Sequence, residues 1–455
     1  MPSSPPGLSF RRLAPPGLGS LRFVKWGRVL TGVALVLSVA GALGILSADY
    51  GSLAIFVAVI ILALGLASTD LVLLPVLAFP ATLVMIRTGP LSVSDLVLIV
   101  ATVPALMLYR RTEAKGLQPL LWAGAVYLAC LVPTLVLNRY LGNYIEWAHE
   151  LILVLGSLLV GWVTGRAGRA GAALLAFQLG CVGIGVAATL QALYLLRTTG
   201  VFGPAYLEFL HKNFIGNTLA FSFLIALVRP RWLNWPTWFH LFVMVVSVLG
   251  IAASNSRQAV VSVFAGVAFL ALRSWGRGAT RRGRVLLLLL IPAVIATAGT
   301  VSEQLESGDA FNSTSQRLTW YAESLRIWQQ SPLFGVGLRW WNTGDHPAFQ
   351  PPNAFFEMIS SAGVLGLFGF LVLCIAGLWV VLLLPRQYAD LAAVVMIARF
   401  VQGQLDLYWV AGQSALPWMM TGLMIGLQAL HQAQDPTTRG FASELPPLTT
   451  ARRAR

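Results

Sequence analysis

Charged residues are scarce in this chain. They make up 11% of its 455 residues, whereas soluble domains carry about 25%. Hydrophobic residues make up 57%, and the mean hydropathy is +0.75. This composition excludes an ordinary soluble enzyme built around one buried core. Apolar runs long enough for a helical membrane crossing, roughly 20 residues each, recur from end to end instead.

Cysteine is equally rare. The three cysteines, Cys130, Cys181 and Cys374, each lie inside an apolar run. None is spaced from another like a pair of zinc ligands or like the members of a disulfide framework. We therefore assign them to helix packing, and we expect neither a metal ion nor another cofactor.

Acidic residues are outnumbered by basic ones, 17 against 31, which gives a net charge of +14. In a soluble protein this excess would suggest nucleic-acid binding. In a membrane protein the positive-inside rule explains it. If the amino terminus is cytoplasmic and the loops alternate, 22 of the 31 basic residues are cytoplasmic, eight are outside and Arg399 lies within a crossing. We thus expect both termini in the cytoplasm and no nucleic-acid partner.

The apolar runs predict an all-α, polytopic membrane fold with about fourteen transmembrane helices (12–14). The expected crossings cover residues 29–48, 52–67, 71–86, 93–109, 118–137, 147–165, 170–196, 214–228, 237–252, 258–272, 285–301, 358–385, 389–404 and 414–431. A Pro- and Arg-rich leader at residues 1–28 precedes them, and a tail at residues 432–455 follows. Both are expected in the cytoplasm, so residues 29–431 form one transmembrane domain.

One long connection, residues 302–353, is expected outside the cytoplasm. It contains an amphipathic helix signal, because Ser313 can cap a helix to which Gln316 reaches back in a capping box. An apolar face follows at spacings of three and four, formed by Leu318, Tyr321, Leu325 and Trp328. The helix is expected to end before Pro332 and to lie along the membrane surface.

Polar residues gather in the segments assigned to the outer side. Such residues mark function in a membrane protein when they do more than solvate loops. The cations among them are Arg197, Lys212, Arg257, Arg317 and Arg339. Arginine presents a planar fork of donors that matches phosphate oxygens, and lysine acts as a point charge. The group therefore suits a phosphate-bearing ligand, although lipid headgroup contacts are an alternative for single members.

Four stretches form an ordered set along the second half of the chain. They are residues 210–216 with His-Lys-Asn, the pair Ser256-Arg257, residues 316–337 from Gln-Arg-Leu to Gly-Val-Gly, and residues 353–366 with Asn-Ala-Phe-Phe-Glu and Ala-Gly-Val-Leu-Gly. Together they resemble the O-antigen ligase and O-antigen polymerase superfamily of membrane glycosyltransferases. The resemblance covers roughly residues 200–430.

The resemblance implies an inverting, metal-independent glycosyltransferase in the bacterial cytoplasmic membrane, with its active site on the periplasmic or external face. The donor would be a glycan on a polyprenyl diphosphate, usually undecaprenyl diphosphate. The acceptor would be a sugar hydroxyl, which belongs to another lipid-linked repeat unit in polymerases and to lipid A–core in ligases. Membrane lipids are further partners, as are proteins that control chain length or export.

The resemblance also implies roles for single residues. Arg257 and Arg317 would hold the diphosphate. The other expected diphosphate- or glycan-binding residues are His211, Lys212, Asn213, Arg197, Arg339 and Asn353. A loop histidine would activate the acceptor hydroxyl, and a near-neutral imidazole suits that task.

The position of this histidine departs from the family pattern. The family places it directly before the asparagine at which the chain returns into the membrane, and Pro352 occupies that position here. His346, beside Asp345, is the nearest loop histidine and the predicted base. Asp345, Glu323 and Glu357 are the other candidates on this side.

Three functions fit these features. The helix number and the His-Lys-Asn element favour a polymerase over an O-antigen ligase. The competing class is a flippase for lipid-linked oligosaccharides, but transporters usually show internal repeats and polar sites near the bilayer midplane. This chain shows no repeat at a fixed period, and its polar residues gather at one rim.

The topology is testable by cysteine labelling. Cysteines introduced at Gly308 and Gly278 are predicted to lie on opposite sides of the membrane, because residues 302–353 are expected outside. An impermeant thiol reagent applied to intact cells should label the variant at Gly308 alone. Equal labelling of both variants would contradict the predicted orientation.

Overall fold

The computed structural model describes residues 57, 61–62, 65–88, 91–275, 313–344 and 349–434. The chain divides into two compact units, residues 1–62 and 63–455, and the second is described below. The expected crossings at 29–48 and 285–301 lie outside the described residues, as do the leader, most of the crossing at 52–67 and the tail beyond residue 434.

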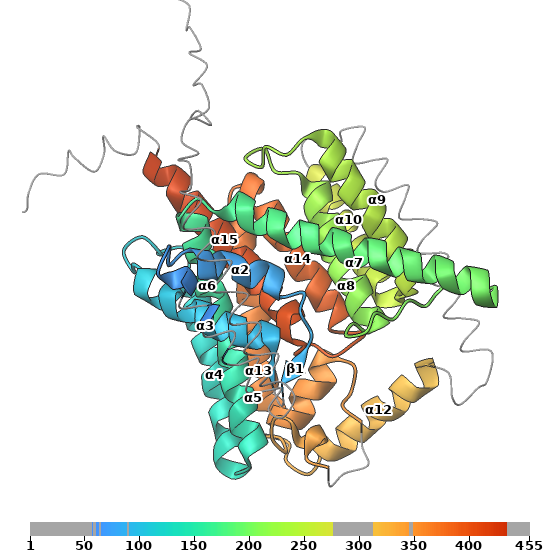
Figure 1. Cartoon of the computed structure of the whole chain (residues 1–455). Coiled ribbons are helices and arrows are strands. Elements are labelled where there is room, and N and C mark those ends of the chain that lie inside the picture. The colour runs from blue at the N-terminus through green and yellow to red at the C-terminus, as the bar shows by residue number, and fades with distance from the viewer. Residues whose placement is uncertain are drawn as a thin grey trace, which may run out of the picture. The chain divides into compact units, whose positions relative to one another are not determined.

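The described chain is mostly helical (Figure 1). The α-helices are α2 Leu73–Ala81, α3 Val93–Leu108, α4 Gln118–Leu137, α5 Leu141–Leu151, α6 Ser157–Arg166, α7 Ala170–Thr199, α8 Lys212–Val228, α9 Thr237–Ser254, α10 Arg257–Trp275, α12 Ser313–Trp328, α13 Ala354–Leu383, α14 Arg386–Gln402 and α15 Ala411–Gln434. A π-helix covers Ile152–Gly156, and a 3-10 helix covers Trp340–Asn342. Two short strands, β1 Arg87–Thr88 and β2 Leu91–Ser92, pair antiparallel.

The helical fold class agrees with the prediction, whereas the count of about fourteen crossings is not confirmed. Six segments of the described chain are long and apolar enough to cross a membrane: Gln118–Leu137, Leu141–Arg166, Ala170–Thr199, Thr237–Ser254, Arg257–Ser274 and Ala354–Leu383. Helices α3 and α8 are shorter apolar helices. Helix α4 begins and ends where the sequence predicted it, and most other helices lie within a few residues of their predicted bounds.

Helix α2 differs from the crossing expected over residues 71–86. It has nine residues and ends at Ala81, after which the hydroxyl of Thr82 bonds to the carbonyl of Phe79 at 2.7 Å. Phe79 and Leu83 are buried in the interior of the protein. The apolar run reflects burial against neighbouring helices here, because a short apolar segment has the same composition in either setting.

The crossing expected over residues 147–165 is longer and less regular. Helices α5 and α6 form one continuous segment, Leu141–Arg166, that is interrupted by the π-helix at Ile152–Gly156. Such π-bulges are frequent at functional sites. Three ionisable side chains lie just before the bulge, namely Glu146, His149 and Glu150, and all are buried.

Helices α6 and α15 pack with their backbones in close contact. Each carries two glycines four residues apart, Gly161 and Gly165 on α6 and Gly422 and Gly426 on α15. A Cβ atom added at any of these positions would overlap a backbone carbonyl oxygen of the facing helix. Small residues at this spacing let membrane helices approach closely, so that dispersion and Cα–H···O contacts replace a hydrophobic driving force.

Helix α13 is kinked, and the loop between α12 and α13 docks into the kink. Gly363 has φ 66° and ψ −167°, a conformation open to glycine. The N–H of Val336 donates to the carbonyl of Ser360 at 3.1 Å. The N–H of Gly337 donates to the carbonyl of Ser361 at 2.8 Å. The loop thus bonds to carbonyl groups on the N-terminal side of the kink.

Helix α12 lies against the start of α13 (Figure 1). The ring of Tyr321 stacks on that of Phe356 with 4.4 Å between centroids. The protein side of α12 buries Ser324 and Ile327, and Ser324 was not expected on the apolar face. Leu318, on the expected apolar face, is exposed.

The α6–α15 contact predicts a position-dependent cost of adding one methyl group. Gly161→Ala should destabilise the protein by about 1–3 kcal/mol, because the new Cβ meets an immobile backbone. Gly183→Ala on α7 is the matched control, since a Cβ there meets nothing within 4 Å. Thermal unfolding of the purified protein in detergent checks both. Equal melting temperatures for the two variants would refute the close packing.

Candidate active site

Two cavities adjoin at one end of the described bundle. The first, of about 460 Å³, is called the carboxylate pocket; it is lined by Arg87, Glu146, Glu150, Leu338, Arg339, Asn342, Gln350, Glu357, Met358, Ser361, Leu407, Trp409 and Val410. The second, of about 800 Å³, is called the cationic pocket; it is lined by His211, Lys212, Asn213, Gln316, Arg317, Trp320, Trp341, Asn342, Phe349, Gln350, Pro352, Leu405, Asp406 and Leu407. Asn342, Gln350 and Leu407 line both, so the cavities share a wall.

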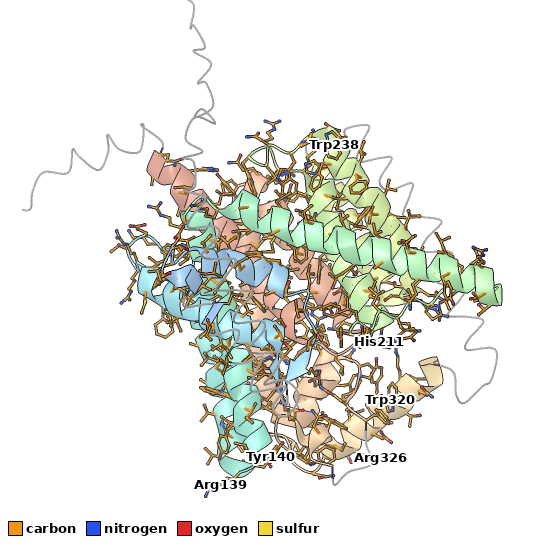
Figure 2. All side chains as sticks on the ribbon, viewed as in Figure 1. Arg139, Tyr140, His211, Trp238, Trp320 and Arg326 are labelled. Carbon is orange, nitrogen blue, oxygen red and sulfur yellow. The ribbon has the colours of Figure 1, made fainter. Side chains whose placement is uncertain are left out.

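The cationic pocket lies between the start of α8 and the side of α12. Figure 2 shows His211, before α8, and Trp320, on α12, at the two sides of this region. Lys212 and Arg317 bring two positive charges, and Asp406 brings one negative charge. Asp406 is partly engaged, because its Oδ2 accepts hydrogen bonds from Gln258 at 2.6 Å and Asn213 at 3.3 Å. The pocket therefore suits an anion that contacts both cations.

His211 caps helix α8 as a neutral ring. Its Nδ1 accepts a hydrogen bond from the N–H of Asn213 at 3.3 Å. Partial burial lowers the pKa of His211 below its usual value; Asp406 acts in the opposite direction, and Lys212 lowers it further. A neutral imidazole at neutral pH follows from the lowered pKa, so His211 contributes hydrogen bonding to this pocket and not a third positive charge.

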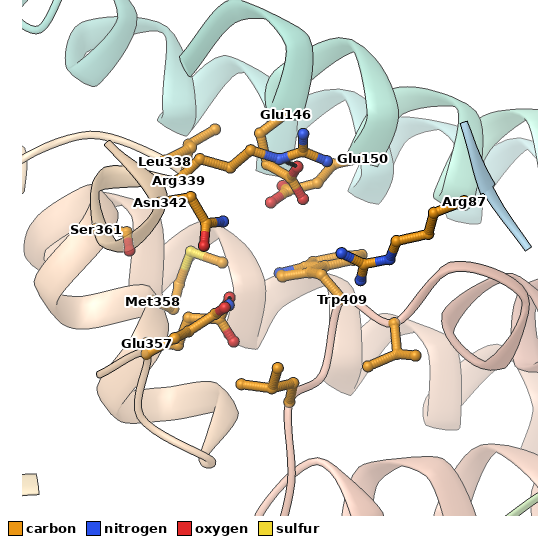
Figure 3. Close-up of a pocket in the computed structure, with 13 residues that line it drawn as sticks. Arg87, Glu146, Glu150, Leu338, Arg339, Asn342, Glu357, Met358, Ser361 and Trp409 are labelled. Carbon is orange, nitrogen blue, oxygen red and sulfur yellow. Dashed lines mark hydrogen bonds and ion pairs between the residues drawn. The ribbon is translucent and has the colours of Figure 1, made fainter. Parts of the chain in front are cut away.

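The carboxylate pocket brings three glutamates together (Figure 3). Glu146 and Glu150 come from α5 and face Glu357, from the first turn of α13, across the cavity. Arg87 and Arg339 also line it. Three carboxyl groups face two guanidinium groups, so the pocket differs in charge from its neighbour.

A chain of buried charges holds Glu146. Its Oε2 accepts a hydrogen bond from the Nε of Arg339 in an ion pair, and its Oε1 lies 3.4 Å from Nδ1 of His149. The Nε2 of His149 lies 2.9 Å from Oδ1 of Asp95 on α3. Arg339 has φ 55°, in the left-handed region, directly before the 3-10 helix. This network joins the α12–α13 loop to α5 and α3.

The other two glutamates have fewer partners. The hydroxyl of Tyr127 donates to Oε2 of Glu150. The Nε2 of Gln350 donates to Oε1 of Glu357 at 2.7 Å. The Oε2 of Glu357 is buried and makes no hydrogen bond within the described part of the chain. Glu357 therefore has one carboxyl oxygen in the pocket wall without a charged partner.

The structure brings several predicted binding residues together. His211, Lys212, Asn213 and Arg317 share the cationic pocket, and Arg339 lines the carboxylate pocket. The contact of Arg339 with Glu146 identifies it as a loop anchor, which the phosphate interpretation did not anticipate.

Two predicted cations line neither cavity. Arg197 lies in the last turn of α7 and is exposed. Arg257 is the first residue of α10 and is exposed, but its neighbour Gln258 bonds to Asp406 in the cationic pocket. Arg257 is therefore near the pocket along the chain, whereas Arg197 has no such link.

Asn353, expected to bind substrate, caps helix α13. Its Oδ1 accepts from the N–H of Phe355 at 2.9 Å and from that of Phe356 at 3.3 Å. Its Nδ2 donates to the carbonyl of Gln404 at 3.1 Å. These contacts fix the point at which the chain enters α13, since a cap satisfies backbone N–H groups that the helix leaves free.

The candidate bases differ in where they lie. His346 and Asp345 lie outside the described residues, and the role of His346 stays a prediction. Glu323, another candidate, lines neither pocket. Glu357 is the remaining candidate and lies in the carboxylate pocket.

The sequence interpretation missed Arg87, Glu146 and Glu150. A signal was present, because Glu146, His149 and Glu150 are spaced to share a helix face and two of them fall inside the expected crossing at 147–165. Ionisable residues in a membrane helix mark functional sites by default. The partner of Glu146 lies 193 positions away and could not be inferred.

The helices and pockets together define an integral membrane protein with a polar site beside the described part of the α12–α13 loop. Residues 242–371 match the family model described as O-antigen ligase. This match confirms the resemblance to the O-antigen ligase and polymerase superfamily. It covers α10, α12, the docked loop and the first part of α13. No curated protein sequence matches the chain.

Proposed function

We propose that this protein is a glycan polymerase of the cytoplasmic membrane of bacteria. It transfers a glycan from polyprenyl diphosphate, typically undecaprenyl diphosphate, to a sugar hydroxyl of another lipid-linked repeat unit on the outer face. The family match supports a glycosyltransferase of the O-antigen ligase type. Lipid donor, glycan acceptor and the surrounding lipids are the proposed partners, together with proteins for chain-length control or export.

The observation that carries this proposal is the shared wall of the two pockets. A glycosyl transfer needs an anion site for the diphosphate directly beside a site for the acceptor hydroxyl. Lys212 and Arg317 supply cations on one side of the wall. Carboxylates on the other side accept hydrogen bonds from sugar hydroxyls. The cavities, of about 460 and 800 Å³, have the size of ligand sites.

The cations act on the leaving group. Breaking the bond between the sugar and the diphosphate leaves additional negative charge on the lipid diphosphate. Arg317, Lys212 and Arg257 would stabilise this charge, since preorganised donors at a site of developing charge lower the barrier without a metal ion. The attack by the acceptor oxygen comes from the side opposite the diphosphate, so the configuration at the anomeric carbon inverts.

An O-antigen ligase is the alternative within the same chemistry. It would use the same donor but transfer the glycan to lipid A–core. The family match fits both readings, and the His-Lys-Asn element favours the polymerase. A flippase has no support from the match.

The reaction predicts a metal-independent release of lipid diphosphate. Purified protein, supplied with a lipid-linked glycan isolated from cells that lack it, should release undecaprenyl diphosphate and extend the glycan in the presence of EDTA. Mass spectrometry of the lipid and glycan fractions checks this. Activity lost in EDTA and restored by magnesium or manganese would contradict the metal-free step, and movement of intact donor across vesicles would favour the flippase.

The cation assignments predict graded losses. Arg317→Ala and Lys212→Ala should weaken binding of undecaprenyl diphosphate about tenfold or more, as expected for hydrogen bonds to a charged group of about 1.5–3 kcal/mol. Arg257→Ala should lower turnover at least about a hundredfold, or roughly 2.7 kcal/mol. Arg257→Lys should recover little, because lysine lacks the planar fork.

Arg326→Ala is the matched control, since Arg326 lies on the same helix as Arg317 and lines neither pocket. Its binding and turnover should stay within about twofold of the wild type, as expected of an isolated surface charge. A similar loss in Arg326→Ala and Arg317→Ala would show that only the overall charge of α12 matters.

A further inference from the structure

We propose that Glu357 is the general base that removes the proton from the acceptor hydroxyl. This assignment rests on the proposed function. It names a proton acceptor for the acceptor hydroxyl, the one step to which no other described residue has been assigned. The position just before Asn353, where the resemblance places a histidine, holds Pro352, which has no titratable group.

The place of the base follows from the two pockets. The acceptor oxygen must meet the anomeric carbon beside the diphosphate, so the base has to lie at the wall between them. Gln350 lines both pockets, and its Nε2 donates to Oε1 of Glu357 at 2.7 Å. Glu357 is thereby held next to the shared wall by a neutral donor.

The other two carboxylates of the pocket are already engaged. Glu146 is ion-paired with Arg339 and contacts His149. Glu150 accepts the hydroxyl proton of Tyr127 in a hydrogen bond and is only 1% exposed. Glu357 has an Oε2 without a hydrogen bond to the described residues, and its side chain lines the open cavity. Of the three carboxylates, it is the one that bonds to Gln350, which lines both pockets.

The backbone around Glu357 is also held in place. Asn353 caps α13 and fixes the first turn, in which Glu357 lies. The N–H of Glu357 donates to the carbonyl of Asn353 at 2.9 Å, and the N–H of Ala354 donates to the carbonyl of Gly403 at 2.7 Å. The backbone that carries Glu357 is therefore anchored to its own cap and to the end of α14, as a positioned base requires.

The step balances without a further reactant. The acceptor oxygen forms a bond to the anomeric carbon while its proton passes to Oε2 of Glu357. The bond between that carbon and the diphosphate oxygen breaks, and its electron pair stays on the diphosphate. The protonated carboxyl then returns its proton to water through the cavity. General-base catalysis of this kind contributes about 10²–10⁴-fold.

The test compares carboxylate variants of the purified full chain. Glu357→Gln should reduce kcat about a hundredfold or more while binding of undecaprenyl diphosphate stays within about threefold of the wild type. The wild-type rate should rise with pH as the carboxyl group ionises, and the variant should lose this limb. Sodium formate should restore part of the activity of Glu357→Ala, because a small carboxylate can occupy the vacated space.

Glu208→Gln is the matched control, since Glu208 is an exposed glutamate that lines neither pocket. This variant should keep the wild-type rate and the wild-type pH profile, and formate should not change its activity. His346→Ala tests the base predicted from the sequence. Its rate should still rise with pH as the wild-type rate does.

The outcomes separate the base from the function. An active wild type with near-normal turnover in Glu357→Gln would overturn the assignment alone. So would a loss of the pH limb in His346→Ala, or a Glu357→Ala variant that binds donor but does not respond to formate. A wild type that releases no undecaprenyl diphosphate from the lipid-linked glycan would overturn the proposed function, and the base with it.

Discussion

Backbone hydrogen bonds at a break in helix α13 hold the site together. A break in an apolar helix leaves carbonyl groups without partners, and water cannot satisfy them where protein or lipid surrounds the chain. Here the N–H groups of Val336 and Gly337 bond to the carbonyls of Ser360 and Ser361. The docked loop carries Leu338, Arg339 and Asn342 to the pocket walls. Both pockets depend on this docking, because the loop residue Asn342 lines each of them.

Buried charge fixes the same loop from its other side. The chain from Asp95 through His149 and Glu146 to Arg339 crosses from α3 to α5 and then to the loop. Buried ion pairs contribute little net stability compared with apolar packing, because desolvation offsets their attraction. Their geometry is nevertheless specific, since a displaced loop would leave buried charges unpaired. The network thus favours one position of the loop, although it adds little to the net stability of the fold.

Local sequence patterns predicted the parts of this protein that depend on local interactions. Helix α4 agrees with its apolar run at both ends. The grouping of His211, Lys212 and Arg317 in one pocket followed from assigning their segments to one side of the membrane.

A helix pattern identifies a face but not what packs against it. The pairing of Arg339 with Glu146 was therefore not predictable. Helix α14 ends at Gln402, and Asp406 beyond it bonds to Asn213 and Gln258.

The glycine contact between α6 and α15 has a consequence for biosynthesis. Its two helices are separated by more than 240 positions, from Arg166 to Ala411. During synthesis, α6 enters the membrane long before its partner exists, and its glycine face meets lipid or other helices in the interval. The centre of the bundle therefore closes only after residues 411–434 have left the ribosome. A chain that stops before α15 lacks the helix that covers the glycine face of α6, and this small-residue surface stays exposed in such a product.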